Sequence, residues 1–254
     1  MRRMRQMTNR REEIKKENKK SFKKFIAIIV VAGIFGGFLG GFSTVLEAHV
    51  VAFVGNIAKM LPQIACYLMI GGGLLFHLFG WSSYLKCKKL KESWDGEEEE
   101  LPELIDKKMG YAMWGMTVNT ILNFFSFSIG LSRGFEGAHL GILLSGFLIN
   151  IFLIVLLQQK MVDLLKELNP EKKGSIYDVK FEKRWMESCD EAQKMQIYHA
   201  AWESYRIMNV AYVFAWMITY MANLFFGADI FATVVVAALW MVQSSVYCYK
   251  SIKE

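Results

Sequence analysis

The histidines and serines of the chain do not fall into the spacings that a catalytic centre requires. The four histidines are His49, His77, His139 and His199, and no two of them lie within helical reach of each other in sequence. The H-E-x-x-H motif, which sets two imidazoles on one helix face around zinc, is absent. Ser145 precedes a glycine in an apolar stretch, but no histidine lies at a matching depth to act as its base. We expect a non-enzymatic protein with no catalytic residue, cofactor or metal site.

Five polar side chains lie inside long apolar stretches, where they need hydrogen-bond partners. They are His77, Asn119, Asn123, Asn150 and Asn223. A polar group within a bilayer is stabilised by a partner on a neighbouring helix, so these residues either join helices or, if they converge, line a polar cavity. Aspartate and glutamate, which would mark a proton or cation path, are missing from the centres of these stretches. Both interpretations of the five residues stay open.

The elements that position these residues are apolar blocks with almost no charge inside them. Each is about twenty residues long, which matches the roughly 30 Å of hydrocarbon in a bilayer when the block is helical. We therefore predict an all-α polytopic membrane helix bundle, in which a basic arm of residues 1–24 precedes a single membrane domain of residues 25–254. The six transmembrane helices are expected at about 25–45, 63–85, 109–131, 140–157, 208–226 and 230–249.

Lysine and arginine predict how this bundle is oriented. If the N-terminus is cytoplasmic, 28 of the 30 basic residues fall on the cytoplasmic side, in or beside the arm, the loops 86–108 and 160–205, and the C-terminal tail. This bias is the usual determinant of membrane topology, so we place both termini in the cytoplasm. The net charge of +6 arises largely from the arm directly before the first span. That position favours contact with anionic lipid headgroups, and we expect no nucleic acid partner.

The first predicted span carries small residues at the spacing of a close helix contact. Pairs four residues apart allow another helix to approach closely in lipid. The partner is either another span of the same chain or a second copy of the protein, which would make a homo-oligomer. The segment 47–60 that follows lies in the outer interface or extends this helix. The glycines concerned are Gly33, Gly36, Gly37, Gly40 and Gly41.

The longest polar stretch contains a predicted amphipathic helix that leads into span five. A preceding helix should end near Leu168, because Asn169-Pro170 follows. From Asp178 onward, apolar residues recur at steps of three and four as far as Tyr205, which indicates a continuous helix. The apolar face of this helix either docks a partner protein or lies along the bundle and the lipid headgroups. The candidate docking residues are Tyr177, Asp178, Phe181, Trp185, Cys189, Asp190, Glu191 and Tyr198.

Part of this stretch resembles a known family. Tyr-Asp-x-Lys-Phe begins at Tyr177 and Ser-Cys-Asp-Glu-Ala begins at Ser188, within the segment 169–198. The segment is similar to an uncharacterised group of multi-span membrane proteins from Gram-positive bacteria, domain-of-unknown-function family 3169. Length and span pattern extend the resemblance over most of the chain. It implies six spans in a bacterial cytoplasmic membrane, and it carries over no activity and no catalytic residue.

Two functions rank ahead of a membrane-embedded enzyme. The first is a non-enzymatic accessory or regulatory protein whose cytoplasmic loops bind a cytoplasmic or membrane protein partner. The second is a small transporter or permease subunit, for example of a peptide or drug exporter. The first predicts a dry bundle that presents Trp185 and Tyr198 outward. The second predicts that His77, Asn119, Asn150 and Asn223 converge on a cavity.

Overall fold

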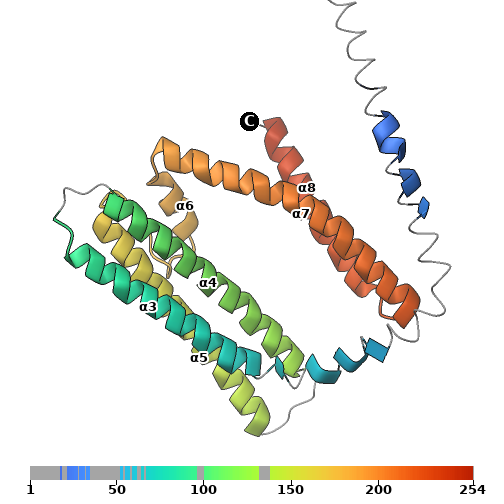
Figure 1. Cartoon of the computed structure of the whole chain (residues 1–254), viewed down its shortest axis with the longest axis horizontal. Helices are drawn as coiled ribbons and strands as arrows, with labels where there is room; N and C mark the ends of the chain where they lie inside the picture. Colours follow the sequence, from blue (N-terminus) through green and yellow to red (C-terminus); the bar gives the residue numbers. More distant parts are fainter. Residues whose placement is uncertain are drawn as a thin grey trace, which may run out of the picture. The chain divides into compact units, whose positions relative to one another are not determined.

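The computed structural model describes residues 68–95, 100–131 and 138–253, together with scattered residues between 18 and 67 (Figure 1). The chain divides into two units, residues 1–55 and 56–254. In the first unit the described residues are helical, at 18, 22–27, 29–31, 33–34, 52–53 and 55. Gly33 is one of them, whereas Gly36, Gly37, Gly40 and Gly41 lie outside the described residues.

All regular elements in the described ranges of the second unit are helices. A π-helical turn, η1 (Leu68–Gly72), continues directly into α3 (Gly73–Glu92). The long helices α4 (Glu100–Leu131) and α5 (Ala138–Leu168) follow, and α5 ends at the residue expected from Asn169-Pro170. After the short α6 (Phe181–Glu187) come α7 (Glu191–Phe226) and α8 (Phe231–Lys253).

Helices α3, α4 and α5 pack together, with α4 running opposite to the other two (Figure 1). Their common core is made of methionine, leucine, isoleucine, alanine and a cysteine that are all buried. Glycine allows α3 to approach α4 and α5 closely. A Cβ atom at Gly80 would lie 2.8 Å from the Cε atom of Met116 and 2.9 Å from the Cδ2 atom of Leu157. Gly115 likewise faces the ring of Phe79. Small residues at such contacts are typical of helices that associate in lipid.

Helices α7 and α8 form an antiparallel hairpin closed by a tight turn. Gly227 ends α7 in the left-handed conformation, with φ of 61°, which glycine adopts without strain. The hairpin is held by aromatic contacts, and the ring centroids of Tyr205 and Tyr247 lie 4.2 Å apart. A hydrogen bond of 3.1 Å from the indole of Trp240 to Asn209 Oδ1 ties the two helices near the middle.

Four helices in the described ranges are long and apolar enough to cross a membrane: 68–92, 140–168, 191–224 and 231–252. They coincide with four of the six predicted spans. The predicted third span lies in α4, which is not among the four, since Asn119, Asn123 and neighbouring serine and threonine residues lower its hydropathy. The first span lies mostly outside the described residues. The count of six spans and the cytoplasmic position of both termini stay predictions.

One prediction about the polar stretch is wrong. The expected continuous helix from Asp178 is broken between α6 and α7 at residues 188–190. The reason is local. Asp190 has extended backbone angles and caps α7, because its side chain accepts a 2.7 Å hydrogen bond from the Gln193 amide. The side chain of Gln193 bonds back to the Asp190 amide, which completes a capping box. A residue that caps one helix cannot continue another.

Candidate functional site

A cluster of amides and an imidazole joins the three helices of the α3–α4–α5 bundle. Asn150 on α5 lies at its centre. Its Oδ1 atom lies 2.7 Å from Nε2 of His77 on α3 and 3.4 Å from Nδ2 of Asn119 on α4. A second contact of 3.4 Å runs from the Asn150 amide back to Oδ1 of Asn119. Since Asn119 is only 1 % exposed, these groups satisfy one another within the bundle.

The other two predicted intramembrane residues lie apart from Asn150. Asn123 is one turn along α4, where its Nδ2 atom donates to the Phe147 carbonyl over 3.2 Å. Its Oδ1 atom is buried without a hydrogen-bond partner. Asn223 lies at the end of α7 and donates to the Ala228 carbonyl over 2.6 Å, so it closes the α7–α8 turn. The structure therefore joins His77, Asn119 and Asn150, and it gives Asn223 a local structural role.

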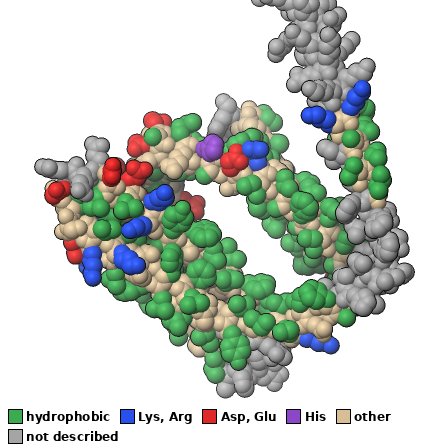
Figure 2. All heavy atoms as spheres, viewed as in Figure 1, with side chains coloured by type: hydrophobic (Ala, Val, Ile, Leu, Met, Phe, Trp, Pro, Cys, Tyr) green, Lys and Arg blue, Asp and Glu red, His purple; other side chains and the backbone are tan. Residues whose placement is uncertain are grey.

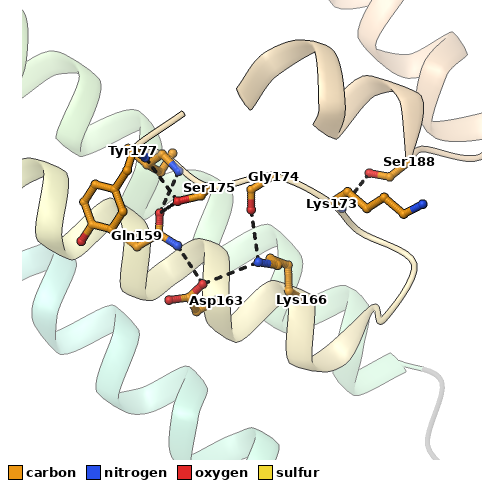
Figure 3. A network of polar contacts seen from close by, with 9 residues as sticks. Gln159, Asp163, Lys166, Lys173, Gly174, Ser175, Tyr177 and Ser188 are labelled. Atoms are coloured by element: carbon orange, nitrogen blue, oxygen red, sulfur yellow. Dashed lines mark hydrogen bonds and ion pairs between the residues drawn. The ribbon is translucent and has the colours of Figure 1, made fainter. Parts of the chain in front are cut away.

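A second cluster fastens the loop after α5 onto α5 itself. The Gln159 Oε1 atom accepts hydrogen bonds from the Ser175 hydroxyl over 2.9 Å and from the Ile176 amide over 2.7 Å (Figure 3). Its Nε2 atom donates to Asp163 over 2.8 Å. Nearby, the Lys166 ammonium donates to the Gly174 carbonyl over 3.1 Å (Figure 3). One glutamine side chain thus fixes the middle of this loop, at Ser175 and Ile176.

Lys172 lies earlier in the same loop and fastens it to α6 and α7. The residue is 7 % exposed, although lysine is seldom buried. Its ammonium lies 3.2 Å from the Cys189 sulfur, donates to the side chain of Gln193 and lies 5.5 Å from the ring centroid of Trp185. Burial raises the pKa of the Asp106 carboxyl above its ordinary value, and the charge of Lys172 acts in the opposite direction. We call residues 159–193 the loop module.

Several of the predicted docking residues make contacts within the loop module. Phe181 and Trp185 pack against each other with centroids 5.6 Å apart, and Cys189 is buried beneath Lys172. Asp190 is occupied as the cap of α7. Trp185 is half-buried in these contacts, between the Phe181 ring and the Lys172 ammonium.

The remaining docking candidates lie at the surface. The Asp178 carboxylate pairs with Arg184 over 2.7 Å, and Glu191 pairs with Lys194 over 3.1 Å. Tyr177 is 64 % exposed and Tyr198 is 58 % exposed. Of the four aromatic side chains in the predicted set, these two are exposed, whereas Phe181 and Trp185 are half-buried.

An exposed apolar stripe runs along α7 toward the loop module. The face of α7 that meets α8 includes Trp202 and Tyr205, which both pack on Tyr247. Residues three and four apart share a helix face, so the stripe continues to Tyr198 and Met195. The Met195 side chain is 65 % exposed. This end of the stripe is apolar, exposed and next to the folded loop module.

Sequence reasoning missed Gln159 and Lys172, which organise the loop module. A lysine in a polar stretch is ordinarily solvated, so nothing in the local pattern marked Lys172 as buried. The capping box was visible, because an aspartate followed three residues later by glutamine is a helix-start signal. Within the described ranges, no group of three or more histidine, cysteine, aspartate or glutamate side chains comes together as a metal site would require.

The described part of the chain is thus an all-helical protein with four helices apolar enough to cross a membrane. The chain belongs to the family described as "Protein of unknown function (DUF3169)", whose model matches residues 19–251. This match confirms the resemblance carried by the segment 169–198 and extends it over nearly the whole chain. No curated protein and no solved structure matches the sequence.

Proposed function

We propose that the protein is a non-enzymatic accessory or regulatory partner of another protein, acting from the membrane through its cytoplasmic segments. The observation that carries the proposal is the apolar stripe at the start of α7, where Met195 and Tyr198 are largely exposed. Helix α7 has 36 residues. It is therefore about 54 Å long, against the roughly 30 Å needed to cross the hydrocarbon core. Since α7 is longer than the membrane requires, its first part, which carries the stripe, lies outside the bilayer when span five is at about 208–226.

The loop module supports this proposal because it makes the stripe rigid. The cap at Asp190 and the buried ammonium of Lys172 hold the first turn of α7 against α6 and the loop. A preorganised apolar surface loses little conformational entropy on binding. Exposed aromatic and methionine side chains are also enriched where proteins bind one another.

The test is co-purification from native membranes in a mild detergent. The double substitution Met195→Ala and Tyr198→Ala removes the exposed end of the stripe. Ile197→Ala is the matched control, because Ile197 is a 40 % exposed apolar residue on another face of the same turns. We expect a stoichiometric partner to be lost from the double variant and retained by the control. Purification of the wild-type protein without any partner would count against the proposal.

A transporter or permease subunit is the second candidate, and the cluster of His77, Asn119 and Asn150 favours it. Polar groups in a membrane bundle often mark substrate or ion pathways. Flux measurements in liposomes separate the two candidates. A transporter should lose flux on His77→Phe while keeping its fold, whereas an accessory protein should show no flux before or after the substitution.

A further inference from the structure

A pocket of about 260 Å³ lies between the polar ends of α3 and α5. The two helices run side by side in the same direction, joined near the middle by His77 and Asn150 and at the end by an ion pair between Lys91 and Glu167. Tyr84 and Leu164 form part of its wall.

The pocket lies where both helices change from apolar to charged. On α3 the apolar run ends with Trp81 and Tyr84 before a group of lysines. On α5 it ends at Leu157, before two glutamines and Lys160. Tryptophan and tyrosine are enriched at this boundary because their rings sit among the lipid headgroups. Charged side chains gather at this end of the bundle, and hydrophobic side chains cover the rest of its visible face (Figure 2). The pocket therefore opens at the headgroup level of one leaflet.

Three lysines and three carboxylates line the pocket, and the carboxylates belong to Glu92, Asp163 and Glu167. The Asp163 carboxylate accepts a 2.8 Å hydrogen bond from Gln159 and lies 3.9 Å from the Lys166 ammonium.

Two of the three lysines are left without a close ion pair. Lys91 is paired with Glu167. Lys88 lies 3.9 Å from Glu92, and both side chains are more than half exposed, so this pair is weak. Among the described residues, Lys160 has no carboxylate within ion-pair distance, and its ammonium lies 5.9 Å from the ring centroid of Trp81.

The faces above the pocket are suited to acyl chains. Positions three and four residues apart share a helix face, so Trp81 lies directly above Tyr84 on α3. By the same periodicity Leu153 lies above Lys160 on α5. Both apolar side chains are more than two-fifths exposed, at 44 % for Trp81 and 43 % for Leu153. A ligand held by the lysines would thus meet apolar surface on the side toward the membrane centre.

We propose that this pocket binds the phosphate of a phospholipid headgroup between Lys88 and Lys160. A phosphate is the anion that a bilayer presents at this depth, and basic pockets between helices at the membrane surface bind such headgroups. Lysine binds phosphate as a point charge and donates charge-assisted hydrogen bonds to its oxygens. The site is separate from the stripe on α7, and its occupancy does not depend on a protein partner. A free phosphate ester shares the same chemistry, so the test must distinguish the two sources.

The experiment is native mass spectrometry of the delipidated full-length protein in detergent, titrated with phosphatidylglycerol. The double substitution Lys88→Gln and Lys160→Gln removes the two available cations. The matched control is Lys86→Gln with Lys89→Gln, which removes the same charge from exposed lysines that do not line the pocket. We expect the pocket variant to lose at least about tenfold in affinity and the control to stay within about twofold. Lys88→Arg with Lys160→Arg should retain binding, because both charges remain.

Three outcomes would overturn the proposal. Equal losses in the pocket variant and the control would show that the attraction is diffuse. Binding of phosphatidylglycerol no tighter than that of a neutral diacylglycerol would show that the phosphate is not recognised. If glycerol phosphate, which lacks acyl chains, binds as tightly as the lipid, the pocket recognises a soluble phosphate ester and the assignment to lipid fails.

Discussion

Replacement of Asn150 by leucine should destabilise the bundle more than replacement of either of its partners. The change removes the 2.7 Å bond to His77 and both 3.4 Å contacts with Asn119. Leucine has the same number and branching of side-chain heavy atoms as asparagine and somewhat more volume, so the change leaves no cavity. An interhelical hydrogen bond in a membrane protein contributes about 0.6 kcal/mol on average and up to about 1.7 kcal/mol. The Asn119 amide, left buried and unpaired, costs about 1–3 kcal/mol more. We expect the free energy of unfolding to fall by about 2–4 kcal/mol.

A double-mutant cycle assigns this loss to particular contacts. His77→Phe and Asn119→Leu are each combined with Asn150→Leu, and the departure from additivity gives the coupling energy. The coupling between His77 and Asn150 should be about 1 kcal/mol, because their 2.7 Å separation is that of a good hydrogen bond. The coupling between Asn119 and Asn150 should be about half as large, because 3.4 Å is at the long end of the range.

The assay is unfolding in mixed micelles by titration with SDS, followed by circular dichroism. Ile149→Ala is the control, since Ile149 precedes Asn150 on α5 and is 58 % exposed. It should change the free energy of unfolding little. Wild-type stability in Asn150→Leu, or a coupling between His77 and Asn150 below about 0.3 kcal/mol, would refute the assignment of these residues as a joint between helices.

Three further changes test local features of the fold, each by the midpoint of thermal unfolding in detergent. Gly174→Ala should destabilise the fold more than Gly227→Ala. Both glycines have positive φ, but a Cβ atom at Gly174 would also lie 2.9 Å from the Phe181 ring. Equal effects of the two substitutions would contradict this reasoning. Asp190→Ala removes the cap of α7 and should lower the free energy of unfolding by about 0.5–2 kcal/mol. Asp190→Asn should lower it much less, because asparagine also caps helices. An unchanged midpoint in the alanine variant would show that the cap does not stabilise the fold. Gly80→Leu should lower the midpoint more than Gly110→Leu, where a Cβ atom meets nothing within 4 Å. The reverse order would contradict the close contact of α3 with α4 and α5.

Helix existence and several helix ends could be predicted from the sequence. The apolar blocks marked the four helices that are long and apolar enough to cross a membrane, because hydropathy and length are sums over neighbouring residues. The end of α5 at Leu168 followed from Asn169-Pro170, since the residue before a proline disfavours helical geometry. The break before α7 was also locally encoded in Asp190 and Gln193. It was missed because the apolar periodicity continues across it.

The partners of the polar residues could not be predicted in the same way. His77, Asn119, Asn150 and Asn223 all had the same sequence signature, an amide or imidazole within an apolar run. The structure joins the first three and uses Asn223 to close a turn. Which residues meet depends on the rotation of each helix about its axis and on the vertical register of its neighbour. Neither is a property of a single apolar segment.

The sequence by itself determined the all-helical class, the apolar helices, the end of α5 and the family to which the chain belongs. These follow from local composition and from motifs that lie within a few residues of one another. Only the tertiary structure decided that Asn150 joins three helices, that Lys172 is buried, and that Trp185 is half-buried while Tyr198 is exposed. Burial and pairing are set by contacts between residues far apart in the chain. Because successive residues are rotated by about 100° around a helix, a small change in helix register exchanges the buried face for the exposed one.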